Sequence, residues 1–206
     1  MKNKCLKLTI TMLISIFILL MIGYDEIFQS FDLKIINIIQ GLENNELTLF
    51  YEVITDVADT YQSMFITIVL VTLLYIKKYK REAIFLAISM SICGIVVPLL
   101  KRFVSRNRPE IHRLIEIEGL SFPSGHSTSA TIMYLTLAII SRSIIKGINK
   151  NLVITLASVG IIIIASSRIY LGVHYPTDVL AGMCLGASIV GLVYLLYYKT
   201  MGGNKV

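Results

Sequence analysis

The stretch from Ser167 to Asp178 holds the residues of this chain that are best suited to chemistry. His174 and Asp178 stand four positions apart, and Arg168 precedes the histidine by six. A carboxylate that binds one ring nitrogen of a histidine fixes its tautomer and leaves the other nitrogen free to act as a nucleophile or a base. Pro176 suits the first turn of a helix, so we expect His174 at the mouth of that helix and Asp178 one turn inside it. The alternative is an ordinary polar loop with a helix cap.

Two earlier polar stretches contain residues that bind anions well. Arg108 is followed by Pro109, which favours an extended backbone and directs the guanidinium away from any continuing helix. Guanidinium groups match phosphate oxygens in a bidentate way. In the tetrapeptide 123–126, Ser124 can cap the following apolar helix while backbone N–H groups and the helix dipole face an anion. His126 would then lie at the edge of that anion site.

The other basic residues of these stretches are less specific. Lys101 stands at the end of an apolar run and is either an anchor at the membrane interface or a further ligand of the anion. We expect Arg102, Arg106 and Arg113 to be surface charges.

A metal site is the competing interpretation, because histidine and carboxylate side chains are common ligands of zinc and iron. Its ligands would be His126, His174, Asp178 and His112. Three cationic side chains in the same place would repel a metal ion, so we predict no metal and treat His112 as a bystander.

The composition is that of a membrane protein. Of the 206 residues 55% are hydrophobic and 16% are charged, and the mean hydropathy of +0.76 is far above that of a water-soluble domain of this size. Uncharged runs near the length of a spanning helix predict an all-α protein with six transmembrane helices in one bundle, forming a single domain over residues 1–206. The predicted spans lie at about residues 8–24, 60–76, 83–100, 125–141, 151–167 and 179–198. The fourth is marginal unless residues 123–126 lie at membrane depth.

The distribution of Lys and Arg predicts the orientation of these spans. With the N-terminus in the cytoplasm, twelve basic residues, Lys205 among them, fall in inner segments and seven in outer segments. All of those seven except Lys34 lie in loops that we expect to form the site. Both termini are therefore predicted to be cytoplasmic and the site extracytoplasmic. The net charge of +6 is scattered between the spans, which argues against a nucleic-acid partner.

Several smaller features of the sequence bear on the fold of the protein. The first apolar run has no small-residue cleavage site after it, so we expect a retained helix rather than a signal peptide. Residues 31–42 have apolar positions at helical spacing, which predicts a helix either along the outer membrane surface or packed over the bundle. Nothing in the acidic segment 23–61 suggests catalysis. Three cysteines, two of them within predicted spans, indicate no disulfide framework.

Taken together, the three polar stretches resemble the signature of the type 2 phosphatidic acid phosphatase family, whose fold is shared with the vanadium-dependent haloperoxidases. They match that signature in order and without a departure. The motifs cover a small part of the chain, and the six predicted spans extend the resemblance to nearly all of it. The matching elements are Lys101-x6-Arg108-Pro109, Pro123-Ser124-Gly125-His126 and Ser167-Arg168-x5-His174-x3-Asp178.

The resemblance implies a role for each matching residue. His174 would attack phosphorus to form a phosphohistidine, oriented by Asp178, and His126 would protonate the leaving oxygen. Fixed cations stabilise the charge that spreads over the phosphoryl oxygens in the transition state. No cofactor is implied. The residues that would hold those oxygens are Lys101, Arg108, Ser124, Gly125 and Arg168.

The function implied is an integral membrane phosphatase that acts on a lipid phosphate or diphosphate at the outer face of the cytoplasmic membrane, with the bilayer and its phosphorylated lipid as partners. The small chain and its use of Ile, Lys and Asn indicate a bacterial source. There the carrier lipid of wall polymers is released at the outer leaflet as a diphosphate, so undecaprenyl diphosphate is the first candidate. Phosphatidylglycerophosphate or phosphatidate is the alternative.

Two other classes of function fit the sequence less well. A haloperoxidase is expected to be soluble and larger, which disagrees with six spans. A non-catalytic transporter or scaffold would have no need of both histidines and Asp178. The sequence predicts no oligomeric state.

Overall fold

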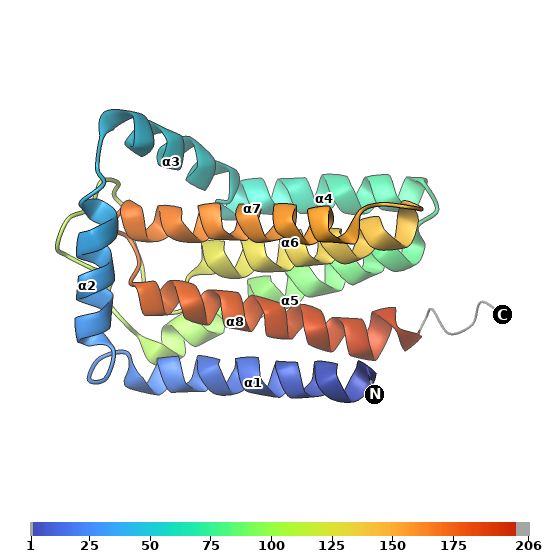
Figure 1. Cartoon of the computed structure of the whole chain (residues 1–206), viewed down its shortest axis with the longest axis horizontal. Helices are drawn as coiled ribbons and strands as arrows, with labels where there is room; N and C mark the ends of the chain where they lie inside the picture. The colour runs from blue at the N-terminus through green and yellow to red at the C-terminus, as the bar shows by residue number, and fades with distance from the viewer. Residues whose placement is uncertain (1, 201–206) are drawn as a thin grey trace.

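The structure, a computed structural model, describes residues 2–200. Lys205, which contributed to the orientation argument, lies outside the described residues. Within residues 2–200 the chain forms eight α-helices and a terminal π-helix and contains no strand, so the prediction of an all-α protein is confirmed (Figure 1). The helices are α1 (Lys2–Gly23), α2 (Gln29–Gln40), α3 (Asn45–Val57), α4 (Thr60–Ile76), α5 (Lys80–Val104), α6 (Gly125–Ile144), α7 (Lys150–Tyr170), α8 (Pro176–Val193) and the π-helix η1 (Tyr194–Tyr198).

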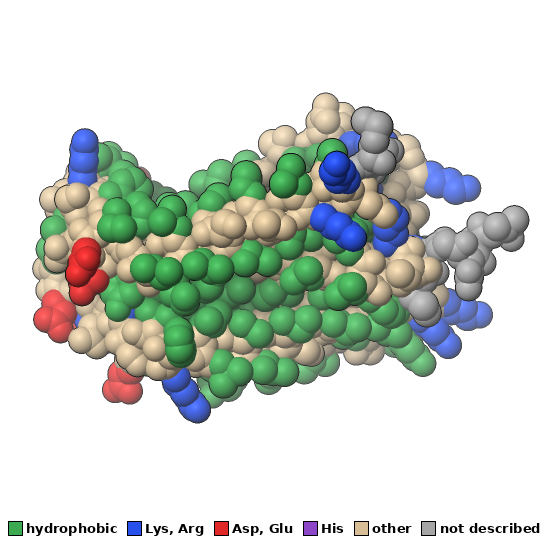
Figure 2. Space-filling view, turned by 90° about the horizontal axis from the view of Figure 1, so that it is seen from below, with side chains coloured by type: hydrophobic (Ala, Val, Ile, Leu, Met, Phe, Trp, Pro, Cys, Tyr) green, Lys and Arg blue, Asp and Glu red, His purple; other side chains and the backbone are tan. Residues whose placement is uncertain are grey.

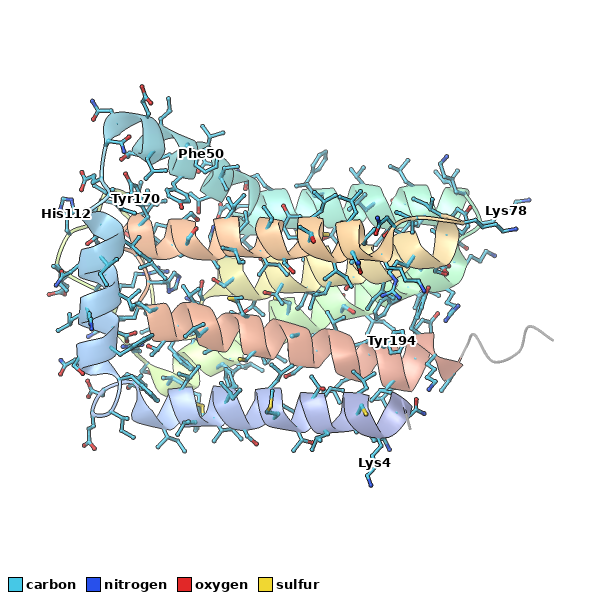
Figure 3. The ribbon with its side chains drawn as sticks, in the orientation of Figure 1. Lys4, Phe50, Lys78, His112, Tyr170 and Tyr194 are labelled. Atoms are coloured by element: carbon cyan, nitrogen blue, oxygen red, sulfur yellow. The ribbon has the colours of Figure 1, made fainter. Side chains whose placement is uncertain are left out.

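The long helices α1 and α4–α8 run along the long axis of the molecule, and α2 lies across one end of them (Figure 1). Both ends of the chain lie at the opposite end of the bundle from α2. Lys4 and Lys78 lie toward the end that holds the chain termini, whereas His112 lies beside α2 (Figure 3). The loops that carry the three motifs therefore share one end of the bundle.

Within residues 2–200 four segments are long and apolar enough to cross a membrane: α1, α5, α7 and Pro176–Tyr198, which joins α8 to η1. The pair α3 and α4, bent by 53°, makes a fifth if the two form one broken span. The helix α6 is not among them, since Ser and Thr interrupt its apolar sequence. The protein is thus a multi-pass helical membrane protein, and six spans remain a prediction. Figure 2 shows apolar side chains covering the middle of one face and Lys and Arg gathered toward the end that holds the chain termini.

Two helix starts place the motif residues. Ser124 caps α6, and its hydroxyl accepts hydrogen bonds from the backbone N–H and the hydroxyl of Ser127, at 3.4 and 2.9 Å, as the sequence predicts. Pro176 begins α8, and the Asp178 side chain accepts the backbone N–H of Tyr175 at 2.9 Å. His174 therefore lies just before α8 and Asp178 within its first turn.

Two glycines let α8 approach α6 closely. A Cβ on Gly182 would lie 2.6 Å from the carbonyl oxygen of Ser124, and one on Gly186 would lie 2.8 Å from that of Thr128. Small residues four apart allow such backbone contact between membrane helices. The contact holds the two helix starts together, and the Ser124 N–H donates to the Asp178 carbonyl at 3.0 Å.

The predicted amphipathic segment 31–42 forms α2, which packs over the bundle. Ile36, only 1% exposed, contacts the apolar side chains of Ala165, Ile169 and Val179. Of the two interpretations of this segment, packing over the bundle is the one that the structure bears out.

Candidate active site

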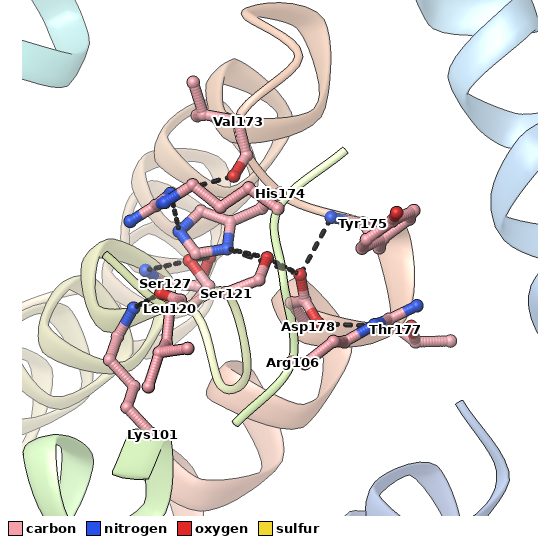
Figure 4. A network of polar contacts seen from close by, with 12 residues as sticks. Lys101, Arg106, Leu120, Ser121, Ser127, Val173, His174, Tyr175, Thr177 and Asp178 are labelled. Carbon is pink, nitrogen blue, oxygen red and sulfur yellow. Dashed lines mark hydrogen bonds and ion pairs between the residues drawn. The ribbon is translucent and has the colours of Figure 1, made fainter. Parts of the chain in front are cut away.

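His174 lies in the loop between α7 and α8 and is 1% exposed. Its Nδ1 lies 3.2 Å from the hydroxyl oxygen of Ser121 and 3.4 Å from Oδ2 of Asp178. Its Nε2 lies 3.2 Å from Nη1 of Arg108. Figure 4 shows the Ser121 hydroxyl between the imidazole ring and the Asp178 carboxylate. The structure therefore brings together His174, Asp178 and Arg108, and adds Ser121, which the sequence analysis missed.

These partners determine which nitrogen of His174 carries hydrogen. Arg108 has only donors, so Nε2 accepts its hydrogen bond. Nδ1 then carries the hydrogen, which faces Asp178 and the Ser121 hydroxyl, and that hydroxyl donates to the same Asp178 oxygen at 2.5 Å. The histidine presents the lone pair of Nε2 to the cationic side of the site.

The electrostatic surroundings keep this ring neutral. Burial lowers the pKa of His174 well below its ordinary value, and the positive charges of Arg108, Arg168 and Lys101 lower it further. An imidazole without a proton on Nε2 is the form that attacks an electrophile. The ring therefore has the protonation state that a nucleophile needs, and attack would require Nε2 to exchange its hydrogen bond from Arg108 for the electrophile.

Arg106 was predicted to be a surface charge, and that prediction is wrong. It is 7% exposed, and its Nη1 and Nη2 donate to Asp178 Oδ1 at 2.6 Å and to Asp32 Oδ2 at 2.8 Å. The two carboxylates neutralise the guanidinium, and the rings of Tyr24 and Tyr175 cover it, with centroids 4.6 and 3.9 Å from its central carbon. Arg102 is exposed, as expected.

The segment 23–61, in which we predicted nothing catalytic, supplies Asp32 from α2. This carboxylate is fully buried and accepts the backbone N–H and the hydroxyl of Thr177, at 2.9 and 2.6 Å, in addition to Arg106. Burial raises the pKa of Asp32, and the hydrogen bonds from Thr177 and Arg106 oppose that rise. Through Asp32 the segment therefore holds Arg106, which in turn contacts Asp178.

Lys101, near the end of α5, and Arg108, in the loop between α5 and α6, both donate hydrogen bonds to carbonyl groups of that loop. The Lys101 ammonium donates to the carbonyl of Leu120, and Arg108 Nε donates to that of Gly119 at 3.0 Å. Arg108 Nη1 also donates to the Val173 carbonyl at 2.8 Å. Both cations are thus held beside His174 by main-chain oxygens, and no carboxylate within residues 2–200 forms a salt bridge with either of them.

Arg168, at the end of α7, is 1% exposed, and among residues 2–200 its side chain has one hydrogen-bond partner, the hydroxyl of Thr55 from α3. Its Nε and Nη2 are buried without any partner in the described part of the chain. Buried donors are normally satisfied, and an unpaired guanidinium is especially costly. These two nitrogens are therefore available to an oxyanion.

His126 stands in the first turn of α6, next to Gly125, and its side chain is 14% exposed. Its Nε2 lies 3.7 Å from Oδ1 of Asp59, at the bend between α3 and α4. A cavity of about 520 Å³ between α4 and α5 reaches both His126 and Gly125. Apolar side chains such as Met64, Ile68 and Val97 line it.

Gly172, one of the five unspecified positions between Arg168 and His174 in the third motif, shapes the loop before His174. Its φ is +72°, and a Cβ there would lie 1.9 Å from the carbonyl oxygen of His112. Any larger residue would push the two loops apart. The His112 ring itself is half exposed and pairs with Glu43 at 2.8 Å. Among residues 2–200 no group of three His, Cys, Asp or Glu side chains has a geometry that suits a metal ion.

The sequence profile of the PAP2 superfamily matches residues 82–201, more than half of the chain and all three motifs. The chain belongs to the PAP2 superfamily. The family that the motifs resembled is thereby confirmed.

Two PAP2 relatives with assigned activities match parts of the chain. Phosphatidylglycerophosphatase B of Bacillus subtilis is 37% identical over 97 residues, which are 46% of this chain and 48% of that protein. Decaprenylphosphoryl-5-phosphoribose phosphatase of Mycobacterium tuberculosis is 32% identical over 131 residues, 61% of this chain and 64% of that protein. The chain thus matches about half of the first relative and less than two thirds of the second.

The fold agrees over nearly the whole chain with a solved PAP2 structure. The crystal structure of a transmembrane PAP2 type phosphatidylglycerolphosphate phosphatase from Bacillus subtilis has a TM-score of 0.86 to this chain at 23% identity. The alignment covers 96% of this chain and 98% of that one. The chain therefore has the same helical fold.

The unpaired nitrogens of Arg168 predict that inorganic phosphate stabilises this protein. At a phosphate concentration about tenfold above its dissociation constant, we expect about 1.4 kcal/mol of stabilisation, seen as a rise in melting temperature in detergent. Arg168→Gln should lose that rise, because the side chain no longer offers a charged donor. Arg102→Gln, an exposed arginine of α5, serves as the matched control and should retain it. A full phosphate response in Arg168→Gln would contradict the assignment.

Proposed function

We propose that the protein is a membrane phosphatase that removes phosphate from a lipid phosphate or diphosphate through a phosphohistidine on His174. The observation that supports this most directly is the placement of His174: its Nδ1 faces Asp178 and Ser121, and its Nε2 faces Arg108. Membership of the PAP2 superfamily supports the same chemistry.

The proposed reaction has two steps. In the first, the Nε2 lone pair of His174 bonds to phosphorus, the bond from phosphorus to the leaving oxygen breaks, and His126 gives that oxygen a proton. In the second, water attacks the phosphohistidine, its proton passes to His126, and Nε2 departs. Lys101, Arg108 and Arg168, with the start of α6 at Ser124 and Gly125, would hold the phosphoryl oxygens throughout. No cofactor takes part in this scheme.

The substrate would be a lipid whose hydrocarbon chain occupies the cavity between α4 and α5. That cavity reaches His126, the residue proposed to protonate the leaving oxygen, so the phosphate end and the apolar end of one lipid can be held together. We propose undecaprenyl diphosphate as the substrate, and a relative that acts on a decaprenylphosphoryl compound supports a polyprenyl lipid. Phosphatidylglycerophosphate is the second candidate, favoured by the name of the Bacillus subtilis relative. Phosphatidate, which is also a lipid phosphate, is the third candidate substrate.

We also propose that the chain is one domain with six spans, α4 and α6 included, and that the motif loops face the outside of the cytoplasmic membrane. On the face seen in Figure 2, more Lys and Arg side chains lie toward the end of the bundle that holds the chain termini than toward the other end, which supports cytoplasmic termini. The site would then meet phosphorylated lipids of the outer leaflet.

Purified protein should hydrolyse at least one of three lipids, undecaprenyl diphosphate, phosphatidylglycerophosphate and phosphatidate, and should do so in EDTA. His174→Ala should abolish turnover in a folded protein, and Asp178→Asn should lower kcat less completely. His112→Ala, a histidine outside the site, is the matched control and should keep full activity. Turnover by His174→Ala near the wild-type rate would refute the mechanism.

A rate on phosphatidylglycerophosphate more than about tenfold above that on undecaprenyl diphosphate, about 1.4 kcal/mol in transition-state binding, would reverse the substrate order.

The orientation can be tested by labelling single cysteines in intact cells with a reagent that does not cross membranes. The natural exposed cysteine, Cys5, is first replaced by serine, and a cysteine is then placed at Glu116 or at Lys80, both exposed and at opposite ends of the bundle. We expect labelling at position 116 alone. Labelling at position 80 alone would invert the proposed orientation.

A further inference from the structure

Arg106 lies outside the residues to which the family signature assigns roles, yet it is the residue that contacts the far side of the Asp178 carboxylate. Asp178 Oδ2 accepts from Ser121 at 2.5 Å and from the Tyr175 N–H at 2.9 Å, and it faces His174. Asp178 Oδ1 accepts from Arg106 at 2.6 Å. With Oδ1 held in this way, the rotation of the carboxylate is fixed and Oδ2 is directed at the imidazole (Figure 4).

Arg106 is itself positioned from outside the bundle core. Its Nη2 donates to Asp32 of α2 at 2.8 Å, and its Nη1 also donates to the Thr177 hydroxyl at 2.7 Å. Asp32 accepts both the N–H and the hydroxyl of Thr177, so one carboxylate from α2 holds the arginine and the first turn of α8 together. The rings of Tyr24 and Tyr175 cover the guanidinium and exclude water from these bonds.

The charge count explains why the arginine is needed. Asp178 and Asp32 are both fully buried, and a buried carboxylate without a cationic partner is strongly destabilised in its ionised form. Lys101 and Arg108 act on Asp178 only at longer range, and His174 is neutral before the reaction. Arg106 is therefore the cation in direct contact with Asp178 within the described residues.

We propose that Arg106, held by Asp32 of α2, is a positioning residue that keeps Asp178 ionised and aimed at Nδ1 of His174, so that docking of α2 is required for the chemical step. This inference rests on the proposed function, because the step it serves is attack by His174. The Arg106 side chain contacts neither the residues proposed to bind phosphate nor Nε2 of His174. It would therefore act on kcat through Asp178 and leave anion binding intact.

A double-mutant cycle between Arg106 and Asp178 separates this role from a merely structural one. Arg106→Gln should lower kcat at least about a hundredfold with KM changed less than about threefold, and Arg106→Lys should recover about tenfold of that loss. In the Asp178→Asn background, Arg106→Gln should lower kcat less than about threefold further, because its target is already altered. Asp32→Asn should lower kcat in the same direction as Arg106→Gln.

Two controls make the outcome specific. Arg102→Gln should leave kcat unchanged, and Arg106→Gln should retain the rise in melting temperature that inorganic phosphate causes. A loss of kcat by Arg106→Gln of equal size in both backgrounds would overturn the inference, because the arginine would then act on the fold and not through Asp178.

A measurement without turnover keeps the inference testable if the proposed function fails. The chain has three histidines, so NMR of isotope-labelled histidine can be assigned with His112→Gln and His126→Gln. We expect His174 to carry its hydrogen on Nδ1 in the wild type and to show mixed tautomers in Arg106→Gln. An unchanged His174 spectrum in that variant would overturn the positioning role, whereas absence of activity on every lipid with the predicted spectra would contradict the proposed function alone.

Discussion

The contact between His174 and the buried carboxylate of Asp178 is the interaction on which the rest of the site depends. A carboxylate with no exposed surface must be satisfied from every side, and here the backbone of Tyr175, the hydroxyl of Ser121 and the guanidinium of Arg106 do so. Arg106 and Ser121 come from the two ends of the loop between α5 and α6, and Tyr175 comes from the start of α8. Satisfying one buried charge therefore ties that loop and the start of α8 to one position, and the Gly182 contact brings α6 against that position.

The four buried or partly buried cations of the site fall into two kinds, which accounts for their different uses. The charge of Arg106 is compensated by two carboxylates and this residue is proposed to position Asp178, whereas two nitrogens of Arg168 have no partner among residues 2–200. Lys101 and Arg108 bond main-chain carbonyls and keep their charge. Cations without a carboxylate partner, placed around a neutral histidine, are suited to bind an anion with spread charge. We therefore expect Lys101, Arg108 and Arg168 to bind the phosphoryl oxygens.

The sequence predicted the residues that directly face the proposed reaction and missed those that support them. His174, Asp178 and Arg108 were found because their types and local spacing carry a chemical meaning, and the helix starts at Ser124 and Pro176 follow from capping rules. Asp32 lies 145 residues from Thr177 and 74 from Arg106, so no local pattern reveals their contact. Apolar runs predicted the helical membrane fold, but they could not predict the bend between α3 and α4 or the glycine contacts that set the packing of α8 on α6, which depend on tertiary structure.

The central claim is that Nε2 of His174 forms a bond to phosphorus, and trapping that intermediate tests it most directly. Purified protein is mixed with whichever of the three lipid substrates it turns over fastest, carrying radiolabelled phosphate, and is quenched in alkali within one turnover. We predict an alkali-stable, acid-labile label on the peptide that contains His174, formed at least as fast as the steady-state rate and absent from His174→Ala. Steady turnover with no labelled protein, or label on a peptide without His174, would contradict the account.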